Sequence, residues 1–169
     1  MVKSNINKIK ERRKMKIAIL FYSKTGHTLE AANAIAEGIK SQGSKVDLIN
    51  INSLEISVLK NYDGIIVGSP CWAGVISTDG VAGPMKKALR KIPNDIVKGK
   101  IGGVFSVYAL SGVKNTIKTL SKTLTNKGFK NVIVGPIAKA GTPFSITKGS
   151  SVSKEDIELY KNFGKTFVQ

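Results

Sequence analysis

The chain has 169 residues, 41% of them hydrophobic, which suffices for one well-packed domain and leaves no room for a second. Its apolar runs are far shorter than the roughly 20 residues of a membrane-crossing helix, and its lone Cys71 can form neither an internal disulfide nor, unaided, a metal centre, so we expect a soluble, cytoplasmic protein without metal. The formal net charge of +16 predicts a positive field that attracts an acidic protein, an anionic membrane or a nucleic acid.

The basic residues are concentrated in two stretches. Residues 1–14 are basic and poor in apolar side chains, and we expect them to form a flexible tail ahead of a domain at residues 15–169. Between Ile96 and Lys154 the chain has no Asp or Glu. Ten lysines recur there: Lys98, Lys100, Lys114, Lys118, Lys122, Lys127, Lys130, Lys139, Lys148 and Lys154. The second half of the domain is therefore expected to present a basic surface.

Strand and helix patterns alternate along the domain. Residues 16–22 form a continuous apolar run, typical of a strand buried on both faces of a parallel sheet, and an apolar helical face follows over residues 29–39. Further segments follow in the same alternation, with strands expected at residues 46–49, 64–68, 100–107 and 131–138 and helices at residues 54–59, 82–92, 114–125 and from Ser153. This order predicts an α/β fold with a doubly wound parallel sheet, which binds ligands at the carboxyl ends of its strands.

The loop after the first strand has the composition of a phosphate-binding loop. Hydroxyl groups surround a glycine, and the loop runs directly into a helix, whose free N–H groups and positive dipole end attract anions. Its residues are Ser23, Lys24, Thr25, Gly26, His27 and Thr28. The glycine spacings of dinucleotide and nucleoside-triphosphate loops do not occur. The alternative is that the hydroxyls cap the helix.

The loops after the third and fourth strands each carry an aromatic ring. Trp72, the only tryptophan, follows the third strand and either stacks on a ligand or covers the sheet edge. Tyr108 follows the fourth strand, with Ser111 and Gly112 as polar donors beside it. An aromatic slot one loop away from a phosphate pocket has the shape of flavin mononucleotide (FMN). We expect Cys71 to be a packing residue, because no second thiol or base accompanies it.

These loops resemble those of the flavodoxin family. Ser23-x-Thr25-Gly26-x-Thr28 is similar to the flavodoxin phosphate loop, and Gly68-Ser69-Pro70-x-Trp72-Ala73-Gly74 is similar to the family's flavin loop. The resemblance covers the chain from Lys16 onward. It implies a three-layer, flavodoxin-like doubly wound sheet with five parallel strands in the order 2-1-3-4-5, and FMN as the cofactor.

The same resemblance assigns roles to individual residues. The phosphate loop holds the FMN phosphate, and Trp72 and Tyr108 flank the isoalloxazine ring. The other expected cofactor contacts are Ser69, Pro70, Cys71, Ala73, Gly74, Ser106, Ser111 and Gly112. His27 either serves the phosphate or a proton transfer, or is a polar surface residue. No catalytic residue and no metal ligand is expected.

The resemblance leaves two redox functions open. The first is an FMN electron carrier between protein partners, and the second is an FMN-dependent NAD(P)H:quinone or flavin reductase, since such relatives share the phosphate loop. A basic nucleic-acid-binding module ranks below both, because aromatic residues are not interleaved with the basic ones. The single Cys71 excludes relatives with an iron–sulfur cluster, and the first strand lacks the acidic pair with which response regulators hold Mg²⁺.

The chain departs from ordinary flavodoxins in its charge. They are acidic and this chain is basic, so we expect an acidic redox protein as its partner, with the chain itself a monomer or a homodimer. The third loop also lacks the acidic residues common in the family. Fewer negative charges near the flavin would make its anionic reduced state easier to reach, which the FMN reduction potentials would reveal.

Overall fold

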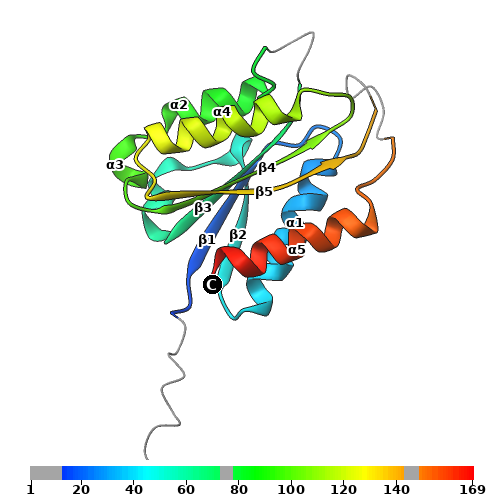
Figure 1. Ribbon diagram of the computed structural model, residues 1–169. Helices are drawn as coiled ribbons and strands as arrows, with labels where there is room; N and C mark the ends of the chain where they lie inside the picture. The colour runs from blue at the N-terminus through cyan, green and yellow to red at the C-terminus, as the bar shows by residue number, and fades with distance from the viewer. Residues whose placement is uncertain (1–12, 73–77, 143–148) are drawn as a thin grey trace, which may run out of the picture.

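A central parallel sheet between two layers of helices forms the core of the protein (Figure 1). The computed structural model describes residues 13–72, 78–142 and 149–169. The five strands are β1 (Lys16–Phe21), β2 (Lys45–Asn50), β3 (Gly64–Pro70), β4 (Ile101–Tyr108) and β5 (Asn131–Lys139), all parallel and in the order β2-β1-β3-β4-β5. The doubly wound sheet and its strand order are therefore confirmed.

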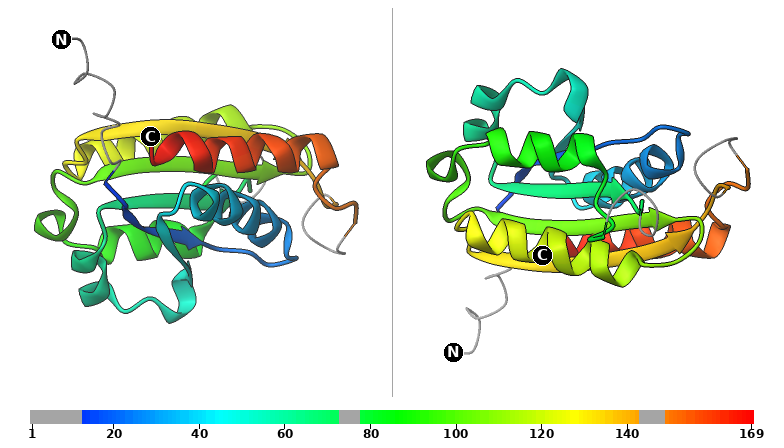
Figure 2. Two further views of the ribbon diagram at one scale, coloured as in Figure 1. Left: turned by 90° about the horizontal axis from the view of Figure 1, so that it is seen from below. Right: turned by 90° about the horizontal axis from the view of Figure 1, so that it is seen from above.

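The helices divide between the two faces of the sheet (Figure 2). Two of them cover one face, α1 (His27–Ser41) and α5 (Lys154–Phe167). The other face carries α2 (Gly83–Lys91), the short α3 (Asn94–Val97) and α4 (Val113–Asn126). The side chain of Ser153 accepts a hydrogen bond from the Asp156 N–H, so the last helix begins with the expected cap.

The segment after β2 differs from the sequence prediction. The short helix predicted at residues 54–59 is present with shifted bounds, as the 3-10 helix η2 (Ile56–Asn61), and another 3-10 turn, η1 (Ile51–Ser53), precedes it. Leu54 and Glu55 between them have extended backbone, so neither turn grows long enough to become an α-helix. The sequence prediction also missed α3, which begins directly after Pro93.

Successive side chains of the inner strands point to opposite faces of the sheet and pack into two separate hydrophobic cores. Ile17, Ile19 and Phe21 of β1 pack with α1 and α5, whereas Ala18 and Leu20 pack with α2 and α4. Both faces of a central strand are therefore buried, which explains why its sequence is a continuous apolar run rather than an alternating one.

Two glycines bring α1 and α5 into close contact. A Cβ atom on Gly38 of α1 would overlap the carbonyl oxygen of Lys161, and a Cβ atom on Gly164 of α5 would overlap the carbonyl oxygen of Ile35. The contact is therefore reciprocal and made by backbone atoms, which leaves no flexible side chain to move aside.

A chain of buried hydroxyl groups crosses the sheet near the carboxyl ends of β3 and β4. The hydroxyl of Tyr160, on α5, donates to the Ser106 carbonyl at 2.8 Å, and the Ser106 hydroxyl donates to the Ser69 carbonyl at 2.7 Å. The Ser69 hydroxyl accepts from the Ala82 N–H, just before α2, at 3.1 Å. Burial, with a smaller effect of Asp156, raises the pKa of Tyr160, so its hydroxyl remains a donor at neutral pH.

The start of the domain is tied to the sheet by an acidic residue. Asp63 accepts hydrogen bonds from the Arg13 guanidinium at 3.2 Å and from the Lys16 N–H at 2.8 Å. Residues 1–12 of the expected tail lie outside the described residues. In the described part of the chain, no helix is long and apolar enough to span a membrane.

The close contact between α1 and α5 predicts that adding a single methyl group at Gly38 or Gly164 destabilises the protein. We expect Gly38→Ala and Gly164→Ala each to lower the free energy of unfolding by about 1–3 kcal/mol, although alanine favours helix, because each new methyl group overlaps backbone. Gly83→Ala at the start of α2 is the control, since its Cβ would meet nothing within 4 Å. Urea unfolding of the three variants measures the difference, and equal stabilities would contradict the reciprocal contact.

The buried hydroxyl chain predicts a second loss of stability. Tyr160→Phe leaves the Ser106 carbonyl without this donor, and we expect it to cost about 1–3 kcal/mol in thermal or urea unfolding. Tyr22→Phe, at a half-buried ring, is the matched control and should change stability little. A Tyr160→Phe protein as stable as the control would show that the hydroxyl chain is dispensable.

Candidate functional site

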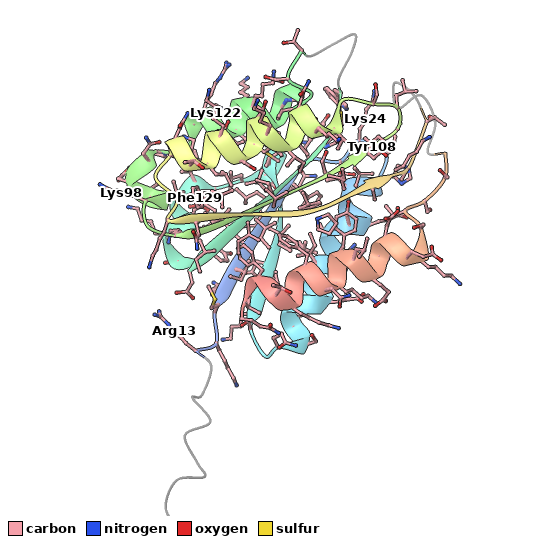
Figure 3. The ribbon with its side chains drawn as sticks, viewed as in Figure 1. Arg13, Lys24, Lys98, Tyr108, Lys122 and Phe129 are labelled. Carbon is pink, nitrogen blue, oxygen red and sulfur yellow. The ribbon has the colours of Figure 1, made fainter. Side chains whose placement is uncertain are left out.

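The loops after β1, β3 and β4 leave the sheet at the same edge. β1 and β4 lie on either side of β3, and β2 lies on the far side of β1, so the strand order reverses between β1 and β3. The Tyr22 N–H donates to a β3 carbonyl at 3.2 Å, and the Cys71 N–H donates to a β4 carbonyl at 2.9 Å. Figure 3 shows Lys24 and Tyr108 at this same end of the sheet. Such an edge is where doubly wound sheets bind ligands.

The first loop presents an uncapped helix end. Gly26 precedes α1 with φ of 99°, in the left-handed region, and no side chain caps the helix. Its N–H donates to the Ser23 hydroxyl at 3.1 Å, which closes the loop. The capping role considered for these hydroxyls is therefore not observed, and the positive dipole end of α1 lies at this loop.

The other hydroxyl residues of this loop differ in exposure. Lys24 is exposed and Thr25 is half-buried, whereas Thr28 lies in the first turn of α1 and is 2% exposed. A Cβ atom on Gly26 would meet nothing within 4 Å, so the space beside the loop is open. An anion that approaches from this side meets backbone N–H groups, hydroxyls and a lysine.

His27 is buried, which excludes the surface role considered for it. Its side chain is 5% exposed, and its Nδ1 lies 3.1 Å from the Glu30 carboxylate, which also accepts the Val152 N–H at 3.3 Å. Burial raises the pKa of Glu30, but hydrogen bonds from His27, Val152 and Ser151 outweigh it, and the net pKa is lowered. Glu30 is therefore ionised at neutral pH, and it connects the first loop to the segment before α5.

Trp72 packs beside the first loop. Its ring is half-buried and lies edge-on to the Tyr22 ring, with centroids 5.6 Å apart and planes at 81°. It also packs against the core under α2 and α4, so it partly covers the sheet edge, as one of the two sequence interpretations has it. The Cys71 thiol donates to the Ser111 carbonyl at 3.3 Å, which joins the second loop to the third. Ala73 and Gly74 lie outside the described residues.

Two expected contacts have their hydroxyls turned into the protein. Ser69 and Ser106 are fully buried and belong to the hydroxyl chain that crosses the sheet. The Ser69 hydroxyl also donates to the Pro70 carbonyl at 2.9 Å. These two hydroxyls hold the strand ends from which the loops leave.

The third loop is partly exposed. Tyr108 is half-buried at the end of β4, and its carbonyl accepts the Ala140 N–H at 2.9 Å. Ser111 is exposed, and Gly112 precedes α4 with φ of 83° and no side-chain cap. Among the described rings, Trp72 contacts Tyr22 and not Tyr108. Two rings that flank a flat ligand do not contact each other, and the described Trp72 and Tyr108 rings make no such contact.

Taken together, this edge offers a set of groups that suits a flavin nucleotide. The uncapped α1 end and the loop hydroxyls suit a phosphate, and the two aromatic rings on neighbouring loops suit a flat heterocycle. No group of three His, Cys, Asp or Glu side chains that could hold a metal ion occurs among the residues described.

Two neighbours of the site were not found from the sequence. Tyr22 supports the Trp72 ring, and Glu30 orients His27. The three-residue spacing of His27 and Glu30 on one helix was a usable pattern, because side chains three apart face each other. The Tyr22 contact depends on the pairing of β1 with β3, which no local pattern reveals.

Comparisons with known proteins agree with this fold. The flavodoxin family model matches residues 19–150. A flavodoxin from Clostridium saccharobutylicum is 37% identical over 93 residues, which cover 54% of this chain and 55% of that protein. The chain thus spans about half the length of that relative. An NAD(P)H dehydrogenase (quinone) from Chromohalobacter salexigens is 28% identical over 158 residues, covering 77% of this chain and 72% of that protein.

A solved structure supports the same assignment. The crystal structure of oxidised flavodoxin 1 from Bacillus cereus has a TM-score of 0.71 and 26% identity, and it covers 90% of this chain and 97% of its own. The strand order agrees with the family match. The chain therefore belongs to the flavodoxin family, whose members bind FMN.

Proposed function

We propose that this protein is an electron carrier that holds one FMN at the carboxyl edge of β1, β3 and β4. The observation that carries the proposal is the uncapped, glycine-led N-terminus of α1 beside two loops with aromatic rings. FMN supplies one- and two-electron transfer when bound. The task of the protein is to bind the nucleotide, orient its ring and bring a partner to it.

The first loop is proposed to hold the phosphate. The amides at the start of α1 and the hydroxyls of Ser23, Thr25 and Thr28 donate to its oxygens, and Lys24 adds positive charge. His27 acts as a positioning residue, because its contact with Glu30 fixes the ring behind the loop. Its burial supports this role over one in proton exchange with solvent.

The second and third loops are proposed to hold the isoalloxazine. Trp72, supported by Tyr22, covers one side, and Tyr108 covers the other. The backbone of Pro70, Cys71, Ala73 and Gly74 faces the ring edge in this proposal. Ser111 and Gly112 contact it from the third loop. Ser69 and Ser106 contribute through the strand ends that they fix rather than through their hydroxyls.

The partner is proposed to be an acidic redox protein. The net charge of +16 favours such a partner over the basic ones that suit an acidic flavodoxin. The lone, half-buried Cys71 supports a cytoplasmic location, where thiols stay reduced. The chain acts as a monomer or a homodimer.

A quinone or flavin reductase is the second candidate. Its support is the similarity to a protein named NAD(P)H dehydrogenase (quinone), which extends over 77% of this chain. The reaction would use the same flavin site with one face open to a second substrate. An oxidoreductase of this kind needs no docking partner.

Flavin binding tests the two halves of the site separately. FMN and riboflavin differ by the phosphate alone. The double variant Ser23→Ala/Thr25→Ala should therefore weaken FMN binding about 10- to 100-fold, because hydrogen bonds to a charged group are lost, and leave riboflavin binding unchanged. Trp72→Ala should weaken the binding of FMN and of riboflavin by the same factor, because the stacking of the indole on the flavin ring is lost. Quenching of flavin fluorescence on titration with apoprotein measures the affinities.

The control for this titration is Thr125→Ala, which removes an exposed hydroxyl on α4 that donates to the Ser121 carbonyl of its own helix. It should leave both affinities unchanged. Apoprotein that does not bind FMN at micromolar concentrations would overturn the proposed function. If the Ser23→Ala/Thr25→Ala variant lost affinity for FMN and for riboflavin by the same factor, only the assignment of the first loop to the phosphate would be overturned.

Turnover separates the carrier from the reductase. We expect purified FMN-loaded protein to oxidise NADH or NADPH with a quinone no faster than free FMN, because a carrier takes its electrons from a protein. An absorbance titration against a redox dye should give the two reduction potentials of the bound flavin. Steady NAD(P)H oxidation without an added reductase would favour the second candidate.

A further inference from the structure

The two helical layers carry very different charge. Helices α2, α3 and α4 together contain seven basic residues against one acidic residue. Helices α1 and α5 contain four basic residues against five acidic ones. Among the helices, the excess positive charge therefore lies on the face that α2, α3 and α4 cover.

The exposed cations of this layer define a basic face. Its members are Lys87, Arg90 and Lys91 on α2, Lys98 after α3, and Lys114, Lys118 and Lys122 on α4. Within residues 13–72, 78–142 and 149–169, none of these seven forms an ion pair. Figure 3 shows Lys98 and Lys122 projecting away from the sheet. Unpaired, solvated charges of one sign create a field that acts on a partner before contact.

The basic face adjoins the candidate flavin edge. Both α2 and α4 begin directly after the loops that leave β3 and β4, so their first turns lie at that edge and their dipoles point positive ends toward it. Lys114 is the second residue of α4, and Lys118 and Lys122 follow at four-residue steps over about 12 Å. The lysines therefore form a row that starts beside the third loop.

An acidic protein suits this face better than a nucleic acid. Six of the seven cations are lysines, which act as point charges, and no aromatic side chain lies on α2 or α4 to stack with bases. A row beside the flavin edge also places the field where electrons must enter or leave. Electrostatic steering raises association rates while demanding little shape complementarity.

We propose that the basic face of α2 and α4 is the docking surface for an acidic electron-transfer protein, which it steers onto the flavin edge. This inference rests on the proposed function, because it names the partner surface of the same site. The α1–α5 face, with balanced charge, takes no part in docking.

Matched charge reversals test the surface. The variant K114E/K118E/K122E alters the basic face, and K40E/K154E/K165E makes the same change in net charge on α1 and α5. The probe is a strongly acidic [2Fe–2S] ferredoxin. Its dissociation constant from the FMN-loaded protein is measured by fluorescence anisotropy, and its rate of flavin reduction by stopped flow, at about 0.02 M and about 0.15 M ionic strength.

At low salt, we expect the basic-face variant to bind the ferredoxin about 10-fold or more weakly and to be reduced about 10-fold or more slowly than the wild-type protein. In the control variant, we expect both quantities to change about 3-fold or less. The wild-type rate should fall as salt rises. K114Q/K118Q/K122Q, which removes charge without adding carboxylates, should show a smaller loss in the same direction. FMN affinity and reduction by dithionite should be unchanged in all variants.

Three results would overturn the inference while FMN still binds. In the first, the two charge reversals weaken ferredoxin binding equally. In the second, the wild-type protein does not bind the ferredoxin. In the third, the wild-type protein binds a short DNA duplex, and only the basic-face variant loses this binding while its rate of electron transfer is unchanged. Failure of the wild-type protein to bind FMN would instead overturn the proposed function. The two failures are therefore distinguishable.

Discussion

The structure depends on the buried hydroxyl chain that links Tyr160, Ser106 and Ser69 to the N–H of Ala82. It begins on α5 below the sheet, passes through the ends of β4 and β3, and finishes at the start of α2 above it. Because buried polar groups cannot fall back on water, each bond constrains the next. The strand ends from which the candidate flavin loops leave are thereby fixed relative to helices on both faces.

The two faces of the sheet then serve different purposes. On one, Gly38 and Gly164 let α1 and α5 pack backbone to backbone, and α1 begins at the edge of the sheet with Gly26 at its cap position. On the other, α2 and α4 bury their apolar sides and leave a row of unpaired lysines exposed. In our proposals, cofactor binding and partner docking use adjacent parts of one edge, where positive helix ends and lysines gather.

Local patterns predicted most of the fold because they reflect short-range physics. The strands buried on both faces read as continuous apolar runs, and Ser153 and Gly26 mark helix ends through their own backbone and side-chain geometry. The bounds of the short helix at residues 54–59 were inexact, because the extended backbone of Leu54 and Glu55 delays its start to Ile56 and it forms as a 3-10 helix. Prediction failed at Asn94–Val97, since four residues carry no periodicity.

The sequence by itself determined the fold class, the strand order by family resemblance, and which loops carry the hydroxyls and aromatic rings. Only the tertiary structure decided what each side chain touches. It turned the Ser69 and Ser106 hydroxyls inward, set Trp72 on Tyr22, and placed seven exposed cations without an ion pair among the described residues on the face of α2 and α4. The reason is that these contacts join residues brought together by strand pairing and layer packing, which no single segment encodes.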